Sequence, residues 1–246
     1  MATADTPPST ANPAARFAPT RWTMIRAARN WHADSAARHA MDELARIYWF
    51  PLYAYLRRKG IDPAHAEDLV QGFFARLLEK NALTAVDRSK GKFRSFLLAS
   101  LQNFLANETD KDRAKKRGGG NVLALDALEA EARYAAEPAD HMTPERVFER
   151  RWALAVLDQV LTHLRADYTR RGHAEVFAAL EHLLVGTDGP DYRTIARRLA
   201  STEPAVKIAA HRLRRRYREL LREEIAQTLS QPELVDEEIR QLLASL

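Results

Sequence analysis

The residues best suited to chemistry in this chain are cations that lie close together near the C-terminus. Between Pro204 and Glu224 the sequence has seven Lys or Arg residues against three Glu residues. Residues three, four or seven positions apart share one face of a helix, so Lys207, His211 and Arg214 are expected to point the same way. Such a face attracts phosphates by charge and can hydrogen-bond base edges in a DNA groove. The pattern predicts a helix that binds a polyanion.

Two predicted helices and a tight break between them position this basic face. Apolar residues at helical spacing mark the first helix, namely Tyr192, Ile195, Ala196 and Leu199. Ala200 and Ser201 form the break, and Thr202 is placed to cap the second helix. Pro204 falls in the first turn of that helix, where a missing N–H costs little.

The second helix is expected to bury one face and to expose the other. The expected buried residues are Val206, Ala209, Ala210, Leu213 and Leu220, and the expected outward residues are Lys207, His211, Arg214 and Arg215. A helix-turn-helix of this kind places the outward face of its second helix in the DNA major groove. An arginine-rich helix can also coat a membrane, bind a partner protein or simply face solvent. The capped, proline-marked break favours DNA binding among these alternatives.

The composition is that of a folded intracellular protein. The chain has 246 residues, 46% of them hydrophobic, which is ample for one large domain or two modest ones. It has no cysteine, which excludes disulfides and thiolate chemistry and fits a reducing cytosol. No apolar run approaches the length of a bilayer span, and the N-terminus lacks the apolar core of a signal peptide. We expect a cytoplasmic protein without membrane insertion.

Catalytic constellations are weak throughout the sequence. The runs His65-Ala-Glu67 and His173-Ala-Glu175 each match a deaminase fragment, but the cysteine ligands of such a zinc site are absent. The glycines at 118–120 are not followed by the Lys-Ser or Lys-Thr of a phosphate-binding loop. The sequence has no His-Glu-x-x-His pair and no Gly-x-Ser-x-Gly elbow. We expect no enzymatic activity, no metal site and no cofactor.

A second basic block lies nearer the middle of the chain and precedes an acidic one. Residues 87–117 hold nine Lys or Arg and four acids, whereas residues 118–150 hold seven acids and three bases. The cations nearest the next predicted helix are Arg88, Lys90, Lys92 and Arg94. A basic loop beside aromatic residues, followed by amides on a helix, can follow phosphates and hold unstacked bases. Phe93 and Asn103 are candidates for those base contacts, although phenylalanine at helical spacing is more often buried.

Helical spacing of apolar residues dominates the chain, and strand-like alternation is missing, so the fold is expected to be all-α. The expected parts are a disordered tail at 1–19, an N-terminal unit at 20–117, a flexible linker at 118–143, a C-terminal unit at 144–229 and an extension at 230–246. The expected helices run from Leu44 to near Gly60, onward from Pro63, across Phe93 to Leu105, from Pro144 with Thr143 as N-cap, and across Val176 to Leu184. A short helical turn is expected between Leu123 and Leu128.

Three stretches, taken in order, resemble one known family. They are EDLVQGFFARLL, GKFRSFLLASLQNFLAN and DYRTIARRLASTEPAVKIAAHRLRRRYREL. The sequence is similar to bacterial RNA polymerase sigma factors of the extracytoplasmic-function type, over about Leu44 to Arg222. Separate blocks in the family's order, with a connector between them, are more specific than either motif alone.

The resemblance implies a role for each unit. The N-terminal unit would bind core RNA polymerase and open the downstream (−10) promoter element, and the C-terminal unit would read the upstream (−35) element as duplex. The residues that match the family's core-polymerase-binding helix are Asp68, Leu69, Gln71 and Phe74. Arg88 through Arg94 match a loop that captures a flipped base, and Asn103 matches a position that faces the melted strand. The recognition helix and its cap are matched by Thr202, Lys207, His211, Arg212, Arg214 and Arg215.

Three residues depart from the family pattern. Gly72 stands where an acid commonly follows the glutamine of the core-binding helix, which removes a charge and costs about 1 kcal/mol of helix propensity. Ala200 stands where glycine is usual in the turn, and Pro204 stands where glycine often opens the recognition helix. Because of these changes, the base edges that the family reads cannot be transferred to this chain.

The sequence therefore predicts a sigma factor without catalytic activity. Its expected partners are core RNA polymerase and promoter DNA, and an anti-sigma protein is a further candidate. The alternative is a polymerase-independent helix-turn-helix regulator that binds a palindromic site as a dimer. That alternative explains the C-terminal half and leaves the basic block at 87–117 unexplained. A scaffold whose basic helix meets an acidic protein or an anionic lipid is a third class.

Overall fold

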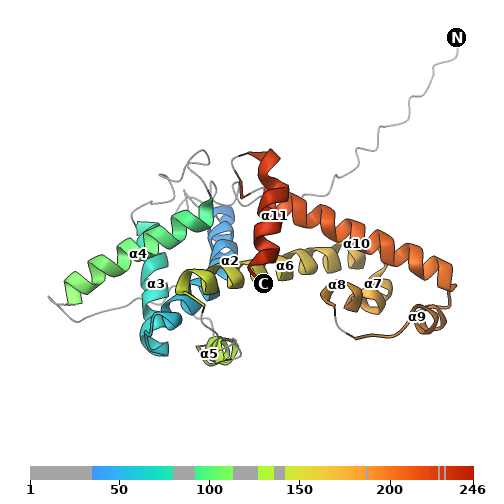
Figure 1. The fold of residues 1–246 in the computed structure, drawn as a ribbon, viewed down its shortest axis with the longest axis horizontal. Helices are drawn as coiled ribbons and strands as arrows, with labels where there is room; N and C mark the ends of the chain where they lie inside the picture. The colour runs from blue at the N-terminus through green and yellow to red at the C-terminus, as the bar shows by residue number, and fades with distance from the viewer. Residues whose placement is uncertain are drawn as a thin grey trace, which may run out of the picture.

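The computed structural model describes residues 35–79, 92–112, 127–135, 142–186, 188–226, 228–229 and 231–246. Within these ranges the chain is mostly helical and has no strand, which confirms the all-α prediction (Figure 1). The helices are α2 (Ser35–Arg58), α3 (Pro63–Glu79), α4 (Phe93–Asp112), α5 (Ala127–Ala135), α6 (Pro144–Arg170), α7 (Ala174–Leu180), α8 (His182–Val185), α9 (Tyr192–Arg198), α10 (Glu203–Ala226) and α11 (Val235–Ala244), with a 3-10 turn, η3 (Pro232–Leu234), before α11.

Local signals in the sequence set several helix boundaries. Gly60 adopts a φ of 86°, which a residue without Cβ reaches easily, and α2 ends just before it. Pro63 opens α3, where the Asp62 carboxylate accepts a hydrogen bond from the His65 N–H at 3.0 Å. Thr143 caps α6 by accepting from the Arg146 N–H at 3.3 Å. These three predicted boundaries are confirmed.

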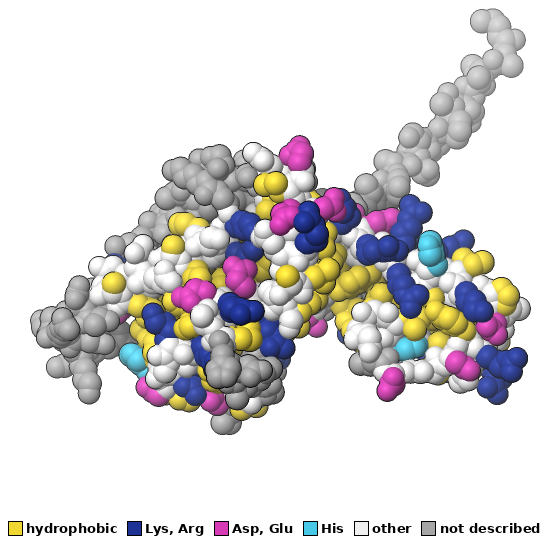
Figure 2. Space-filling model, in the orientation of Figure 1, with side chains coloured by type: hydrophobic (Ala, Val, Ile, Leu, Met, Phe, Trp, Pro, Cys, Tyr) yellow, Lys and Arg dark blue, Asp and Glu magenta, His cyan; other side chains and the backbone are white. Residues whose placement is uncertain are grey.

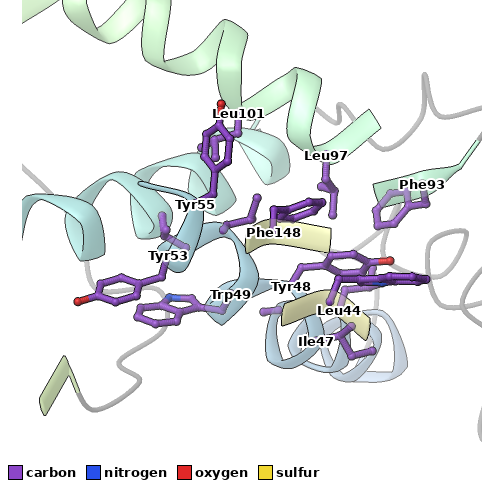
Figure 3. Packing of buried hydrophobic residues seen from close by; sticks show 14 of the residues in the cluster. Leu44, Ile47, Tyr48, Trp49, Tyr53, Tyr55, Phe93, Leu97, Leu101 and Phe148 are labelled. Atoms are coloured by element: carbon purple, nitrogen blue, oxygen red, sulfur yellow. The ribbon is translucent and has the colours of Figure 1, made fainter. Parts of the chain in front are cut away.

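The larger of two hydrophobic cores is built around α2. Four aromatic residues of this helix, Tyr48, Trp49, Tyr53 and Tyr55, are at most 1% exposed. Trp49 stacks on Tyr53 with ring centroids 5.2 Å apart, and Tyr48 meets Phe93 of α4 edge-on at 5.4 Å (Figure 3). A helix that is apolar on nearly all sides belongs at the centre of a core, where α3, α4 and α6 surround it.

The N-terminal half of α6 packs into this same core. It contributes Phe148, Trp152, Ala153, Val156 and Val160, and the end of α10 and helix α11 add Leu221, Ile225, Val235 and Leu242. The predicted linker at 118–143 contains α5, whose Ala130 is 2% exposed and whose Glu131 pairs with Arg57 of α2 at 2.8 Å. The described parts of the two predicted units therefore share one core, because α6 is long enough to serve both. The division of the chain at 117 and 143 remains a prediction.

A smaller core holds the C-terminal helices together. It joins Leu164 of α6 and Phe177 of α7 to Ile195 of α9 and Leu213 of α10. The helix predicted across Val176 to Leu184 is interrupted at Glu181, so α7 and α8 are two short helices. Helix α10 spans both cores, since its first half packs in the smaller one and its last turns pack in the larger one. In the described ranges, no helix is both long and apolar enough to cross a membrane.

Candidate nucleic-acid interface

The turn between α9 and α10 is built as the sequence predicts. At the start of α9, the Asp191 carboxylate accepts from the Thr194 N–H at 2.8 Å, and this hydrogen bonding holds the pKa of Asp191 below its usual value. At the start of α10, the Thr202 hydroxyl accepts from the Ala205 N–H at 3.4 Å. The N-termini of α9 and α10 are thus both capped by a side chain, which fixes where each helix begins.

Ala200 is the break residue, and it carries backbone strain. Its φ of 48° lies in the left-handed region, and it is the one residue other than glycine with a positive φ within the described ranges. The following Ser201 N–H donates to the Ala196 carbonyl at 2.9 Å, which closes the end of α9 in the manner of a Schellman motif. An L-residue with a Cβ pays roughly 1–2 kcal/mol in this conformation, which explains why glycine is common at such a position.

Buried contacts hold α10 against the rest of the C-terminal helices. Val206, Ala210 and Leu213 are at most 2% exposed, and they pack with Ile195 of α9 in the smaller core. Ala209 and Leu220, also predicted to be buried, are partly buried. The sequence therefore predicted the inward face of α10 correctly.

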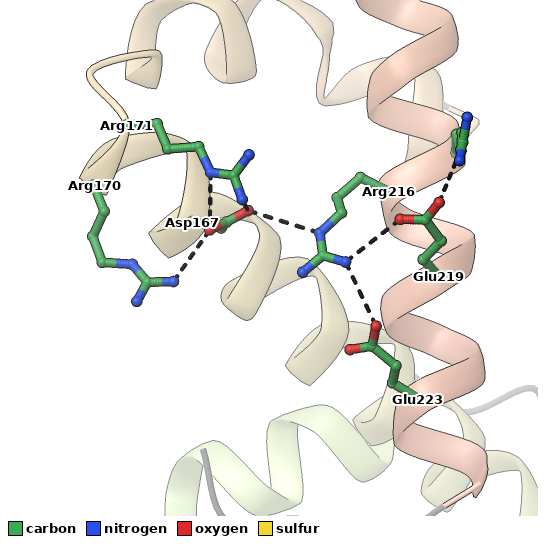
Figure 4. Close-up of polar contacts among 7 residues, drawn as sticks. Asp167, Arg170, Arg171, Arg216, Glu219 and Glu223 are labelled. Atoms are coloured by element: carbon green, nitrogen blue, oxygen red, sulfur yellow. Dashed lines mark hydrogen bonds and ion pairs between the residues drawn. The ribbon is translucent and has the colours of Figure 1, made fainter. Parts of the chain in front are cut away.

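A cluster of charged side chains also joins the middle of α10 to α6. Asp167 of α6 lies 3.2 Å from Arg170, 3.0 Å from Arg171 and 3.8 Å from Arg216 of α10 (Figure 4). Arg216 in turn reaches Glu219 at 3.5 Å on its own helix. Asp167 has only 12% of its side chain exposed, so it is screened by solvent less than a surface acid is. Arg216 is therefore committed to positioning α10 and is turned away from the predicted binding face.

The outward face of α10 is open to solvent. All six residues predicted to contact duplex DNA are exposed: Thr202, Lys207, His211, Arg212, Arg214 and Arg215. Figure 2 shows Lys and Arg side chains gathered over α9 and α10. The structure thus brings these predicted residues together on one surface, with the inward face of the helix buried beneath them.

Ion pairs on this face are local and exposed. Lys207 pairs with Glu203 at 2.8 Å, and Arg215 pairs with Glu219 at 2.9 Å, both one helical turn apart. The hydrogen bond with Glu203 raises the pKa of Lys207 above its usual value. Exposed pairs of this type are worth little, so a phosphate can replace the glutamate at low cost.

Two residues of the outward face were not predicted. Arg218 is exposed, and its guanidinium donates to the Arg214 carbonyl at 3.3 Å. Ile208 is 55% exposed beside Lys207, three positions before His211. Helical spacing was the available signal, since positions 207, 211, 214, 215 and 218 follow one stripe and Ile208 lies three and four positions before His211 and Arg212.

The second basic block is placed very differently. Arg88 and Lys90 lie outside the described residues. Phe93 is 2% exposed and packs in the larger core, and Arg94 is 5% exposed. Lys92 is partly exposed, with 32% of its side chain accessible to solvent. The predicted base contacts of Phe93 and Arg94 are thus not accessible in this arrangement, because Phe93 packs on Tyr48 of α2 and Arg94 is enclosed by α6 and α11.

Asn103 is exposed and lines a groove between α3 and α4. The groove has a volume of about 220 Å³, and Arg76, Ser100 and Asn107 line it beside Asn103, whereas its two phenylalanines, Phe73 and Phe104, are only 2% and 8% exposed. Amides can hydrogen-bond the edges of unstacked bases, and a guanidinium can contact the phosphates beside them. Asn103 is therefore the predicted downstream residue whose surroundings suit a base.

The predicted polymerase-binding residues lie on α3. Asp68 is exposed and Gln71 is half-buried, with its amide donating to Glu67 at 3.0 Å. Leu69 and Phe74 are 9% and 2% exposed and belong to the larger core. Phe74 is therefore a core residue and adds no ring to this surface. The polar edge, Asp68 with Gln71, is what a partner could contact here.

Comparisons with known proteins bring no match: no family model, no curated protein and no solved structure is similar to this chain. Across the part of the chain that the structure describes, no group of three or more His, Asp or Glu side chains is placed to hold a metal ion. The chemistry of the candidate interface is that of its own cations, amides and hydroxyls.

Proposed function

We propose that this protein is a sigma factor, which binds core RNA polymerase and directs it to promoter DNA. Helices α9 and α10 form the helix-turn-helix, and α10 is the recognition helix. The observation that carries the proposal is the two-sided character of α10, which buries Val206, Ala210 and Leu213 and exposes Lys207 and Arg214. Helices of this kind enter the major groove, with the buried face holding them to the domain.

The groove beside Asn103 supports a second contact with DNA. Duplex DNA is read at the major groove, whereas melted DNA offers unstacked bases and flexible phosphates. The α10 face suits the first and the α3–α4 groove suits the second. The two together give a protein that holds one DNA molecule at a paired and at a parted segment. The free energy of binding unstacked bases offsets the cost of unpairing them.

Duplex binding is tested first with Arg214→Ala combined with Arg215→Ala. Each phosphate contact contributes a slope of about 0.9 in log K against log salt, so losing two lowers the slope by about 1.8. Arg146→Ala combined with Arg240→Ala removes the same charge from two exposed residues outside this face and is the matched control. Fluorescence anisotropy on a labelled duplex selected from a random library gives the affinities. Equal losses in the two double variants would show that net charge, not the α10 face, drives binding.

Polymerase dependence is tested by transcription from a genomic-fragment library with purified core polymerase, with and without the chain. New start sites that need the chain support the proposal. The arginine double variant should abolish those starts while still co-purifying with core polymerase. Tight binding to a symmetric operator, without affinity for core polymerase, would instead establish the dimeric regulator.

A further inference from the structure

The C-terminal helix α11 places an acid over the second basic block. Glu238 of α11 is 2% exposed, although it is a carboxylate on a short surface helix. One of its oxygens lies 2.5 Å from the Lys92 ammonium, and the other forms an ion pair with the Arg94 guanidinium. Gln241, one turn further, accepts from Lys92 at 2.8 Å. Two side chains of α11 thus bind the two cations that begin α4.

Arg94 is the point where three helices meet. Its side chain is 6% exposed and pairs with Glu149 of α6 at 2.6 Å as well as with Glu238. The guanidinium lies over the Trp152 ring of α6, 4.2 Å from the ring centroid. Two cations and two carboxylates balance in charge, which is the condition under which such groups can be buried.

The partners of Arg94 are not equivalent. Glu149 and Trp152 belong to α6, which is fixed in the larger core, so they stay beside Arg94 whatever α11 does. Glu238 belongs to a helix of ten residues that lies at the end of the chain over α6 and α10 (Figure 1). Helices of this length have little stability alone and depend on their contacts. If α11 moves away, Lys92 and one edge of Arg94 become an open cationic site.

The remaining contacts of α11 are modest. Val235 and Leu242 are buried in the larger core and Ile239 is partly buried against it, whereas Leu243 is 54% exposed. An ion pair joins Asp236 to Arg222 of α10, and both side chains are at least half exposed. Exposed pairs contribute little, so the hold on α11 is a small apolar contact plus the buried pairs of Glu238.

We propose that α11 is an intramolecular acidic cover for a polynucleotide-binding site formed by Lys92 and Arg94. The Glu238 carboxylate occupies the place of a backbone phosphate, so α11 and single-stranded DNA compete for the same two cations. This inference rests on the proposed function for its ligand, and it adds a regulation that the function does not require. The apparent affinity for single strands then scales with the fraction of molecules in which α11 is displaced.

Glu238→Gln tests the cover while keeping the shape of the side chain. Glu237→Gln is the matched control, because it removes the same charge from the neighbouring residue. The Glu237 side chain is 45% exposed and pairs with Arg240. The probe is a fluorescein-labelled single-stranded DNA of mixed sequence, followed by anisotropy at several salt concentrations. We expect Glu238→Gln to bind more tightly than Glu237→Gln, with a slope against log salt steeper by about 1.4, at 0.7 per freed cation. Equal binding by the two variants overturns the cover.

A reversible lock tests the same inference without relying on the stability of Glu238→Gln. The chain has no cysteine, so Arg222→Cys with Asp236→Cys provides two unique thiols, at exposed side chains of α10 and α11 that pair in the structure, and it leaves Lys92 and Arg94 unchanged. A bismaleimide reagent that contains a disulfide joins them, and a reductant separates them again. We expect the locked protein to lose single-strand binding, to recover it on reduction, and to bind duplex DNA through α10 in both states.

The lock also separates this inference from the proposed function. Duplex binding together with single-strand binding that ignores the lock overturns the cover and leaves the proposed function standing. A protein that binds neither form of DNA, locked or reduced, overturns both.

Discussion

The two basic regions of this chain carry similar side chains in opposite surroundings. On α10, Lys207 and Arg215 have 56% and 72% of their side chains exposed, and their acid partners lie one turn away on the same helix. At the start of α4, Arg94 has 6% exposed, and its partners come from two other helices. Charge on the first surface is available to a ligand, whereas charge on the second has been used to join α4, α6 and α11.

The difference shows that the cations of a basic run can be either exposed to solvent or buried among other helices. Exposed cations keep their hydration and exchange partners freely, so they contribute to binding and little to stability. A buried cation has lost its hydration and depends on each partner that replaces it. Variants of the two regions should therefore act on opposite properties, and this gives the comparison its sharpest tests.

The largest expected effect is on stability, with Arg94→Ala against Arg214→Ala. Arg94→Ala removes the cation of a buried cluster and the side chain over Trp152, and we expect it to destabilise the protein by about 3 kcal/mol. Arg214→Ala, on the exposed face, should change stability by less than about 0.5 kcal/mol. Urea unfolding followed by circular dichroism measures both. Similar losses of unfolding free energy in the two variants would show that the buried and the exposed cation contribute equally to stability.

The second effect concerns the acid that positions α10. Asp167→Ala leaves Arg171 and Arg216 without their shared carboxylate, and we expect a loss of about 2 kcal/mol in the free energy of unfolding. Arg170→Ala is the control, because 63% of that side chain is exposed and its removal leaves the contact with α10 in place. It should cost under about 0.5 kcal/mol in the same urea titration. A harmless Asp167→Ala would mean that apolar packing alone seats α10.

Sequence predicts the exposure of the α10 residues better than that of the residues at the start of α4. The reason is the distance along the chain between contacting residues. The outward face of α10 follows from helical period, since all its residues lie within one helix and its caps are local. The burial of Arg94 depends on Glu149 and Glu238, which lie 55 and 144 positions away. No local pattern carries that information, so Arg94 was predicted as a DNA contact. Phe93 was a candidate base contact whose helical spacing already indicated burial.

The linker illustrates the same limit. Glycines at 118–120 and a weak period predicted a flexible connector at 118–143. The structure shows α5 within it, anchored by Ala130 and by the pair between Glu131 and Arg57. Nine residues offer too little periodic signal to stand out, and their partners on α2 lie more than 70 positions earlier. Tertiary contact, not helix propensity, explains why this segment is ordered.

The third prediction extends the comparison to α5 through pH. Hydrogen bonds from Arg57, and then from Tyr53, hold the pKa of Glu131 below its usual value. A lowered pKa stabilises the fold above the unfolded value, and this stabilisation is lost as pH falls through the folded value. We expect Glu131→Gln to cost about 1 kcal/mol at pH 7, and the gap to wild type to narrow below about pH 4.

Unfolding curves at intervals between pH 7 and pH 3 measure that gap. Glu145→Gln serves as the control, because Glu145 is an exposed acid in the first turn of α6 and its gap to wild type should be small at every pH. A gap for Glu131→Gln that stays constant across this range would show that its pair with Arg57 does not depend on the carboxylate charge.

The smallest effect has the opposite sign and lies in the turn that presents the open face. Ala200→Gly relieves a Cβ held at a φ of 48°, and we expect it to stabilise the protein by up to about 1 kcal/mol, the strain relief exceeding the added entropy of the unfolded chain. Ala166→Gly makes the same change at an exposed site inside α6 and should destabilise by about 1 kcal/mol. Duplex affinity should be unchanged in both, since neither alters the cations of α10. Thermal unfolding separates the two variants by the sign of the change in melting temperature. An equal loss of stability in Ala200→Gly and Ala166→Gly would show that Ala200 is not strained.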